Sequence, residues 1–83
     1  MKTAVAILNW NGLSLLTKFL PSVVDNTPND IDIYIIDNGS SDNSIGFVKR
    51  NFNNVKIIDL EMNYGYAHGY NLGIKKIDAD IIC

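Results

Sequence analysis

The stretch IYIIDNGSSDNS, residues 33 to 44, decides the fold because an apolar run changes abruptly to polar residues within it. Continuous runs of Ile and Val are typical of parallel strands that are covered on both faces. We therefore predict a buried strand at Ile31–Ile36. A hairpin turn would be the simplest explanation of the polar residues, but they lead into a helical pattern and not into a returning strand.

Strand and helix patterns alternate along the rest of the chain. Further strands are predicted at Val5–Leu8, Val55–Leu60 and Ala79–Cys83. Helices are predicted near Ser14–Asp25, after Ser41 or Asp42 as a capping residue, and near Tyr66–Lys76. Such alternation predicts βαβ units with right-handed crossovers and a parallel sheet. The predicted fold class is therefore α/β, a β-α-β-α-β-α-β half of a doubly wound sheet.

Two of these helices carry more detailed predictions. In the first, six apolar residues are expected to form one stripe: Leu15, Leu16, Phe19, Leu20, Val23 and Val24. Pro21 lies inside that helix and should kink it or remove one backbone hydrogen bond. In the third, Ala67 and Tyr70 are expected on the same apolar face as Ile74 and Ile77.

Composition narrows the class of protein. The 83 residues are 47% hydrophobic and 19% charged, with a formal net charge of −2. This apolar content argues against disorder, and the slightly negative net charge argues against a basic surface that would bind nucleic acid. Cys83 is the single cysteine, so an intrachain disulfide is impossible and a reducing compartment is favoured. We expect a cytoplasmic location, with the inner face of a membrane left open.

Three unusual segments each follow a predicted strand: NWNG (Asn9–Gly12), DNGSSD (Asp37–Asp42) and NYGYAHG (Asn63–Gly69). In a parallel sheet the carboxyl ends of the strands share one edge, so these segments are expected to meet there. Open α/β sheets bind ligands in the crevice at that edge. The sequence therefore predicts a ligand site built from these three loops.

The DNGSSD loop offers groups that suit a pyrimidine base. Asp37 or Asn38 can accept the imide N–H of uracil or thymine, and Asn38 can also donate to a ring carbonyl. Gly39 allows close approach of the backbone to a ligand or a positive φ. The simpler alternative is a turn at Gly39 followed by a helix cap at Ser41 or Asp42, and the two interpretations are compatible.

The other two loops contribute aromatic and small residues. Trp10, the only tryptophan, can stack on a base, or it can pack in the core or against a missing domain. Asn9 and Asn11 can contact a ligand or satisfy loop backbone. Around the third helix start stand Asn63, Gly65, Gly69, Asn71 and Gly73. Glycines are costly in a helix, so they suggest close approach to a strand or to a ligand. No second ligand stands near His68 at metal spacing.

Other common sites are missing. The chain has no G-x-x-x-x-G-K-[ST] phosphate loop, and no G-x-G-x-x-G follows the first strand.

Three motifs together resemble a known family. In this order and spacing, VAILNWNG, IDIYIIDNGSSDNS and NYGYAHGYNLGI resemble the N-terminal part of family 2 glycosyltransferases with the GT-A fold. They look most like the rhamnosyl- and galactofuranosyltransferase branch.

The resemblance implies an inverting transfer of a sugar from a UDP- or dTDP-sugar to a hydroxyl of a sugar or lipid-linked acceptor, in cell-surface polysaccharide synthesis. The loop of Trp10 and Asn11 would flank the nucleoside. Asp37, with Asn38 beside it, would recognise the pyrimidine, and Asn63–Gly73 would border the donor pocket. A D-x-D motif after the fourth strand would hold Mg²⁺ or Mn²⁺, and a later carboxylate would act as the base.

This sequence departs from the family pattern at its end. It stops at Cys83, before both features, and its own DAD, Asp78–Asp80, precedes the last predicted strand and is expected to form a turn. We therefore expect residues 1–83 to be an incomplete, truncated nucleotide-sugar-binding part. It would contain no catalytic residue and no metal ligand, and alone it would transfer no sugar.

Two other classes of function stay open. A non-catalytic nucleotide-binding α/β module, such as a receiver-like domain, would need an acidic pair after the first strand, where Asn9, Trp10 and Asn11 stand instead. A structural module would self-associate through an exposed sheet edge. Light scattering that showed a clean monomer would count against this last class.

Overall fold

The structure, a computed structural model, describes residues 1–83. Four strands, β1 (Thr3–Asn9), β2 (Asp32–Asp37), β3 (Lys56–Asp59) and β4 (Ile81–Ile82), form one parallel sheet in the order β3-β2-β1-β4. The helices are α1 (Leu13–Asn26), α2 (Ser44–Asn51) and α3 (Tyr66–Ile74). The predicted β-α-β-α-β-α-β order and the parallel sheet are confirmed.

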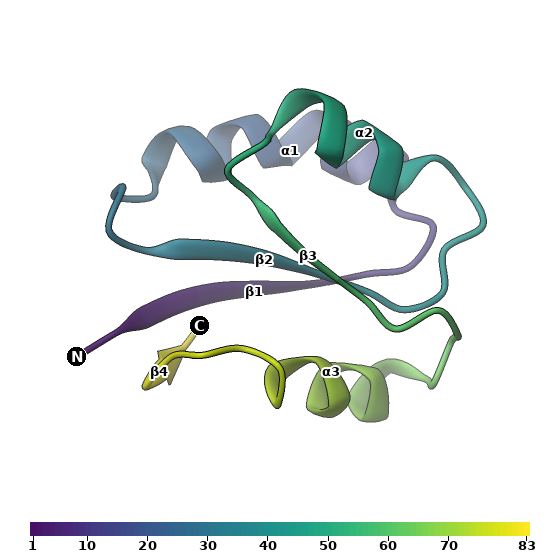
Figure 1. Cartoon of the computed structure of the whole chain (residues 1–83). Helices are drawn as coiled ribbons and strands as arrows, with labels where there is room; N and C mark the ends of the chain where they lie inside the picture. Colours follow the sequence, from purple (N-terminus) through teal and green to yellow (C-terminus); the bar gives the residue numbers. More distant parts are fainter.

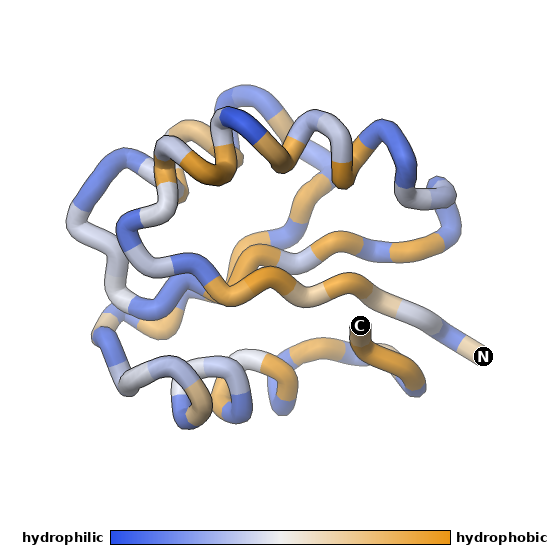
Figure 2. Tube along the Cα trace, turned by 180° about the vertical axis from the view of Figure 1, so that it is seen from behind, coloured by the Kyte–Doolittle hydropathy of each residue, from blue (hydrophilic) through white to orange (hydrophobic).

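The sheet is covered on both faces, with α1 and α2 on one side and α3 on the other (Figure 1). Side chains of β2 alternate between the two layers, as the pleat of a strand requires. Ile33 and Ile35 join the apolar cluster beneath α1 and α2, whereas Tyr34 and Ile36 join the cluster beside α3. The strands between the layers are accordingly the most continuously hydrophobic part of the chain (Figure 2). Because helices cover both faces of the sheet, the residues of β2 from Ile33 to Ile36 are all apolar or aromatic.

The predicted apolar stripe of α1 is wrong in part. Leu16 and Leu20 are buried, but Leu15 is 63% exposed and Phe19 is 54% exposed. Successive residues of a helix point about 100° apart, so Leu16 and Leu20 face the sheet while Leu15 and Phe19 turn outward. Val23 and Val24 are both half-buried against the same cluster, as predicted. The helix continues through Pro21 without a break. None of the helices combines the length and the hydropathy needed to cross a bilayer.

Several boundaries differ from the predictions. The helix α2 begins at Ser44 and its N-cap position is Asn43, so the predicted cap position at Ser41 or Asp42 is wrong. The side chain of Asp42 still supplies a capping hydrogen bond from one residue earlier, since its Oδ1 accepts from the Ser44 N–H at 3.0 Å. The helix α3 ends at Ile74 rather than at Lys76, and Ala67 is exposed because glycines of α3 face the sheet instead. The strand β4 is confined to Ile81–Ile82.

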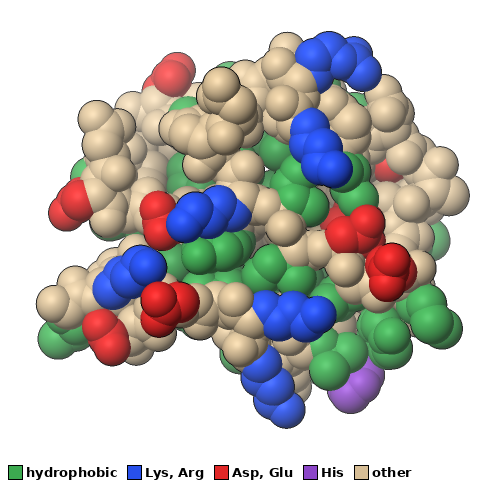
Figure 3. All heavy atoms as spheres, in the orientation of Figure 1, with side chains coloured by type: hydrophobic (Ala, Val, Ile, Leu, Met, Phe, Trp, Pro, Cys, Tyr) green, Lys and Arg blue, Asp and Glu red, His purple; other side chains and the backbone are tan.

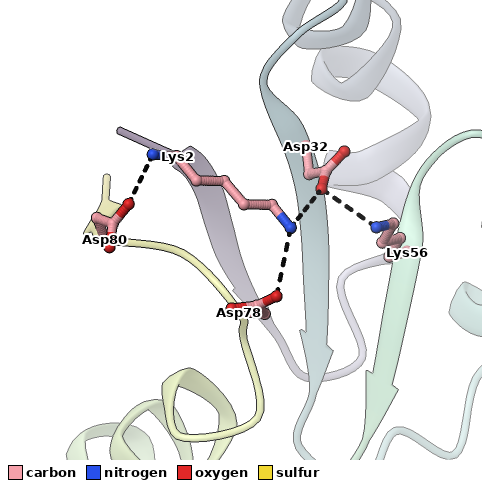
Figure 4. A network of polar contacts seen from close by, with 5 residues as sticks. All are labelled: Lys2, Asp32, Lys56, Asp78 and Asp80. Atoms are coloured by element: carbon pink, nitrogen blue, oxygen red, sulfur yellow. Dashed lines mark hydrogen bonds and ion pairs between the residues drawn. The ribbon is translucent and has the colours of Figure 1, made fainter.

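Charged side chains join the amino ends of the strands (Figure 4). The Asp32 carboxylate lies 3.1 Å from Nζ of Lys56 and 4.0 Å from Nζ of Lys2. Asp78 lies 3.6 Å from the same Lys2 Nζ, and Asp80 accepts a 2.7 Å hydrogen bond from the Lys2 backbone N–H. The two aspartates of the DAD sequence therefore lie before β4, as predicted, at the sheet edge opposite the three unusual loops. The predicted turn at Asp78–Asp80 is wrong, because the turn lies earlier, at Lys75 and Lys76.

Candidate functional site

The β1–α1 loop, the β2–α2 loop and the β3–α3 loop meet at the carboxyl edge of the sheet (Figure 1). The chain moves outward from β1 to β2 and β3, then crosses back to β4 on the far side of β1. This reversal is the kind of switch point at which open α/β sheets bind ligands. The predicted meeting of the three segments is confirmed.

Asp37 joins β1 to the β2–α2 loop. It is the last residue of β2 and only 1% exposed. Its Oδ1 accepts hydrogen bonds from Asn9 Nδ2 at 2.8 Å and Ser40 Oγ at 2.7 Å, and its Oδ2 accepts one from the Ser40 N–H at 2.9 Å. A buried carboxylate is stable when it is hydrogen-bonded in this way. In the structure, the side chains of Asp37 and Asn9 therefore hold the end of β1 to the β2–α2 loop. Their contact with a ligand stays a prediction.

Asn11 and Asp42 tie the first two loops together. Oδ1 of Asn11 accepts from the N–H groups of Ser41 at 2.7 Å and Asp42 at 3.1 Å. Oδ2 of Asp42 accepts from the N–H of Leu13, the first residue of α1, at 3.1 Å, while its Oδ1 caps α2 at Ser44. The Ser44 hydroxyl also donates to this carboxylate and is the main reason that the Asp42 pKa is lowered. One side chain therefore caps two helices.

Asn38 links β2 to the β3–α3 loop. It is 3% exposed, and its Nδ2 donates to Oδ1 of Asn63 at 3.2 Å and to the carbonyl of Gly65 at 3.0 Å. Its Oδ1 accepts from the N–H of Tyr64 at 2.9 Å. The side chain thus binds three successive residues of one loop.

The glycines allow close packing of chain on chain. At Gly39, φ is 76° and an added Cβ would lie 2.5 Å from the Met62 carbonyl carbon. An added Cβ at Gly69 would lie 2.7 Å from Oδ1 of Asn38. Gly65 differs, because its φ is 81° but the space around it is open. Of the two alternatives for the glycines, approach to a neighbouring strand or loop is therefore the one visible in this fold.

A hollow of about 380 Å³ opens between these loops. Its lining residues are Leu8, Trp10, Asn38, Asn63, Gly65 and Tyr66. Trp10 is 56% exposed, so the alternative that places it in the core is wrong, and Tyr66 is 75% exposed. Figure 3 shows hydrophobic side chains gathered near the one histidine, His68, toward the end where α3 begins. The hollow therefore has aromatic side chains that are open to solvent.

The predicted binding residues fall into three groups. Trp10, Asn38, Asn63 and Gly65 line the hollow. Asn9, Asp37, Gly39 and Gly69 support the loops by hydrogen bonds or close packing. Asn11 ties loops together at the surface, and Asn71 is exposed on α3 without lining the hollow.

The sequence reasoning did not single out Leu8 or Tyr66, although Tyr66 lies within the Asn63–Gly73 segment that was expected to border the donor pocket. Tyr66 carried a usable signal, since an aromatic residue that opens a helix directly after a glycine lies at the carboxyl edge. Leu8 carried none, because an apolar strand residue that lines a hollow has the same pattern as one that lies in the core.

The residues of this chain do not fit a divalent metal. No group of three His, Cys, Asp or Glu side chains lies close enough together to hold an ion. The ring of His68 instead contacts that of Tyr64 edge-on, with centroids 5.8 Å apart. Asp78 and Asp80 are engaged by Lys2 at the opposite edge.

A second hollow of about 370 Å³ lies near the amino ends of the strands, between the end of α1, the segment leading into β2, and Asn54. None of the three loops lines it. Because ligands of open α/β sheets bind at the carboxyl edge, the hollow beside Trp10 is the better candidate site.

Comparison with known proteins gives the family. The family model for glycosyl transferase family 2 matches residues 4–83. An uncharacterized glycosyltransferase of Mycoplasma genitalium is 36% identical over 75 residues, covering 88% of this chain and 25% of that protein. The teichoic acid poly(glycerol phosphate) polymerase of Staphylococcus epidermidis is 26% identical over 81 residues, covering 93% of this chain and 11% of that protein. The chain thus spans a quarter or less of the length of these relatives.

Solved structures have the same fold. S. aureus TarS 1-349 in complex with UDP-GlcNAc superposes with a TM-score of 0.82 at 24% identity, over 99% of this chain and 25% of that chain. The mannosyltransferase PcManGT from Pyrobaculum calidifontis, in complex with GDP-Man and Mn²⁺, gives 0.80 at 17% identity, over 98% of this chain and 26% of that chain. The predicted GT-A sheet is confirmed, and the family match over residues 4–83 shows that the chain belongs to glycosyl transferase family 2.

Proposed function

We propose that residues 1–83 are the N-terminal nucleotide-sugar-binding part of a GT-A glycosyltransferase domain, and that the hollow beside Trp10 receives the nucleoside of a UDP- or dTDP-sugar. The observation that carries the proposal is the solvent-open aromatic lining of a hollow at the switch point of the sheet. TarS, which shares the fold, is described in complex with UDP-GlcNAc, and this supports a nucleotide sugar as ligand.

Stacking supplies the binding energy in this proposal. Trp10 is held at the mouth of the hollow by the β1–α1 loop, and that loop is fixed by the hydrogen bond from the Asn11 N–H to Ser40 Oγ at 2.9 Å. Stacking of a base on an aromatic side chain is worth about 1–3 kcal/mol. A loop that is ordered before binding loses little conformational freedom when the base arrives.

The complete enzyme would transfer the sugar, with inversion, to a hydroxyl of a sugar or lipid-linked acceptor in cell-surface polysaccharide synthesis. The named role of the S. epidermidis relative in teichoic acid polymerisation supports this class of product. The metal, Mg²⁺ or Mn²⁺, would neutralise charge on the leaving diphosphate, and we place its ligands and the catalytic base outside these residues. We also propose a cytoplasmic site of action, at or near the inner face of the membrane.

Calorimetric titration with UDP tests the proposal. The folded chain should bind UDP and dTDP more tightly than GDP, and Trp10→Ala should weaken UDP binding about tenfold or more, since about 1.4 kcal/mol corresponds to tenfold. Phe19→Ala is the matched control, because Phe19 is also a half-exposed aromatic residue but lies on α1 away from the hollow. Folded protein that binds no UDP, or equal affinity in the Trp10 variant and wild type, would contradict the proposal.

A further inference from the structure

We infer that Asn38 is a positioning residue, which holds the β3–α3 loop in place as one wall of the hollow and does not donate a hydrogen bond to the base. The inference rests on the proposed function, because the hollow is taken as the nucleoside site. It revises the sequence-based expectation that Asn38 donates to a ring carbonyl.

The donor capacity of the Asn38 side chain is used within the protein. An amide has two N–H donors, and both are engaged, one by Asn63 Oδ1 and one by the Gly65 carbonyl. The amide oxygen accepts from the Tyr64 N–H. A base in the hollow would have to displace one of these bonds before Asn38 Nδ2 could donate to it.

The side chain also has no room to turn toward a ligand. The Asn38 backbone N–H donates to the Asn9 carbonyl at 2.8 Å, which fixes the residue at the end of β1. Gly69 of α3 lies directly against the amide, and even a methyl group there would come within 2.7 Å of Oδ1. Asn38 is therefore held between β1 and α3 while its amide faces the loop.

The loop depends on this amide for its shape. Asn63 Oδ1 accepts not only from Asn38 but also from the Gly65 N–H at 2.8 Å, so one oxygen closes the turn. Gly65 adopts a φ of 81° next to that turn. Asn63, Gly65 and the following Tyr66 all line the hollow, so the position of the wall follows from the bonds to Asn38.

Replacement of the amide by a carboxylate separates this role from simple packing. Asn38→Asp keeps the size of the side chain, but an oxygen would then face the two acceptors that Nδ2 serves. Burial and those oxygens would raise the pKa of the new carboxyl above its usual value of about 3.9. Once protonated, the carboxyl can donate one hydrogen bond again, so the defect should be partly reversed by acid.

The test uses uridine as the probe, because it carries no phosphate that titrates in the same range. We expect Asn38→Asp to bind uridine about tenfold more weakly than wild type near pH 7.5 and to approach wild type near pH 5. Asn51→Asp is the control, since Asn51 Nδ2 also donates to a carbonyl, that of Phe47, but lies on α2 away from the hollow. This control should bind uridine as wild type does at both values of pH.

A second pair of variants acts on the exposed partner and keeps the test valid if Asn38→Asp does not fold. Asn63→Asp retains an oxygen that accepts from Asn38 and Gly65, whereas Asn63→Ala removes it, so Asn63→Ala should bind uridine more weakly than both Asn63→Asp and wild type. Wild-type affinity in Asn63→Ala, or in Asn38→Asp at both values of pH, would overturn the inference. Absence of uridine binding to folded wild-type protein would instead overturn the proposed function.

Discussion

Gly73 allows α3 to lie against the middle of the sheet, and Gly73→Ala tests how close that contact is. The added Cβ would lie 2.4, 2.5 and 2.7 Å from three side-chain carbons of Ile36, where contacts of about 3.5–4.0 Å are favourable. Ile36 is 0% exposed and β-branched, so it cannot turn away easily. Overpacking of this kind costs about 1–3 kcal/mol, whereas Ala in place of Gly stabilises a helix by about 1 kcal/mol.

Three such short distances place the overpacking cost in the upper part of its range, at about 2–3 kcal/mol, so the net expectation is a free energy of unfolding that is lower by about 1–2 kcal/mol. For a domain of this size, a loss of that magnitude lowers Tm by about 5–15 °C. Thermal and urea denaturation followed by far-ultraviolet circular dichroism measures both quantities.

Gly46→Ala in α2 is the matched control for this substitution. Its added Cβ would lie 2.4 Å from Oδ1 of Asn43, but that side chain is exposed and free to rotate. The helix propensity of Ala should therefore dominate and stabilise the chain by about 0.5–1 kcal/mol. If Gly73→Ala were as stable as wild type while Gly46→Ala behaved as expected, α3 would not pack against Ile36 as closely as the structure shows.

The remaining predictions concern caps, charges and turnover. Asp42→Ala removes the acceptor for the N–H groups of Leu13 and Ser44, so urea titration should show a loss of about 1–2 kcal/mol at neutral pH. Because the Asp42 pKa is lowered in the folded state, the stabilisation by its carboxylate is present above about pH 4 and is lost as the pH falls through the lowered value. A stability difference between Asp42→Ala and wild type that persisted in strong acid would refute a role for the ionised carboxylate. Asp32→Asn should lower the urea midpoint slightly in low salt and not in high salt, since it removes the anion that raises the Lys56 pKa; an effect equal at both ionic strengths would argue against the ion pair. The purified chain should not turn over UDP- or dTDP-sugars with added Mg²⁺ or Mn²⁺, and measured transfer would show that catalytic groups lie within it.

Much of the fold was predictable because β2 is covered on both faces. An uninterrupted run from Ile33 to Ile36 indicates a buried parallel strand, and helical spacing on either side indicates the crossovers. The errors arose where periodicity cannot choose between neighbours. Leu15 and Leu16 are equally apolar, and only the direction in which α1 lies on the sheet decides that Leu16 is buried.

For the candidate site, residue order determined the edge at which the loops meet, and the positions of Trp10 and of the Asn63–Gly65 loop follow from that order. The sequence by itself therefore determined the fold class and the edge that carries the candidate site, because these follow from local patterns and from the rule that parallel strands share one carboxyl edge. The family followed from the resemblance of its three motifs.

Only the tertiary structure decided what each polar residue does there. It buries Asp37 and Asn38 and satisfies their polar atoms with partners that are 3 to 28 positions away, and it leaves Trp10 and Tyr66 open to solvent. A residue type shows which hydrogen bonds a side chain can make, but the packing of the loops determines which of them remain for a ligand.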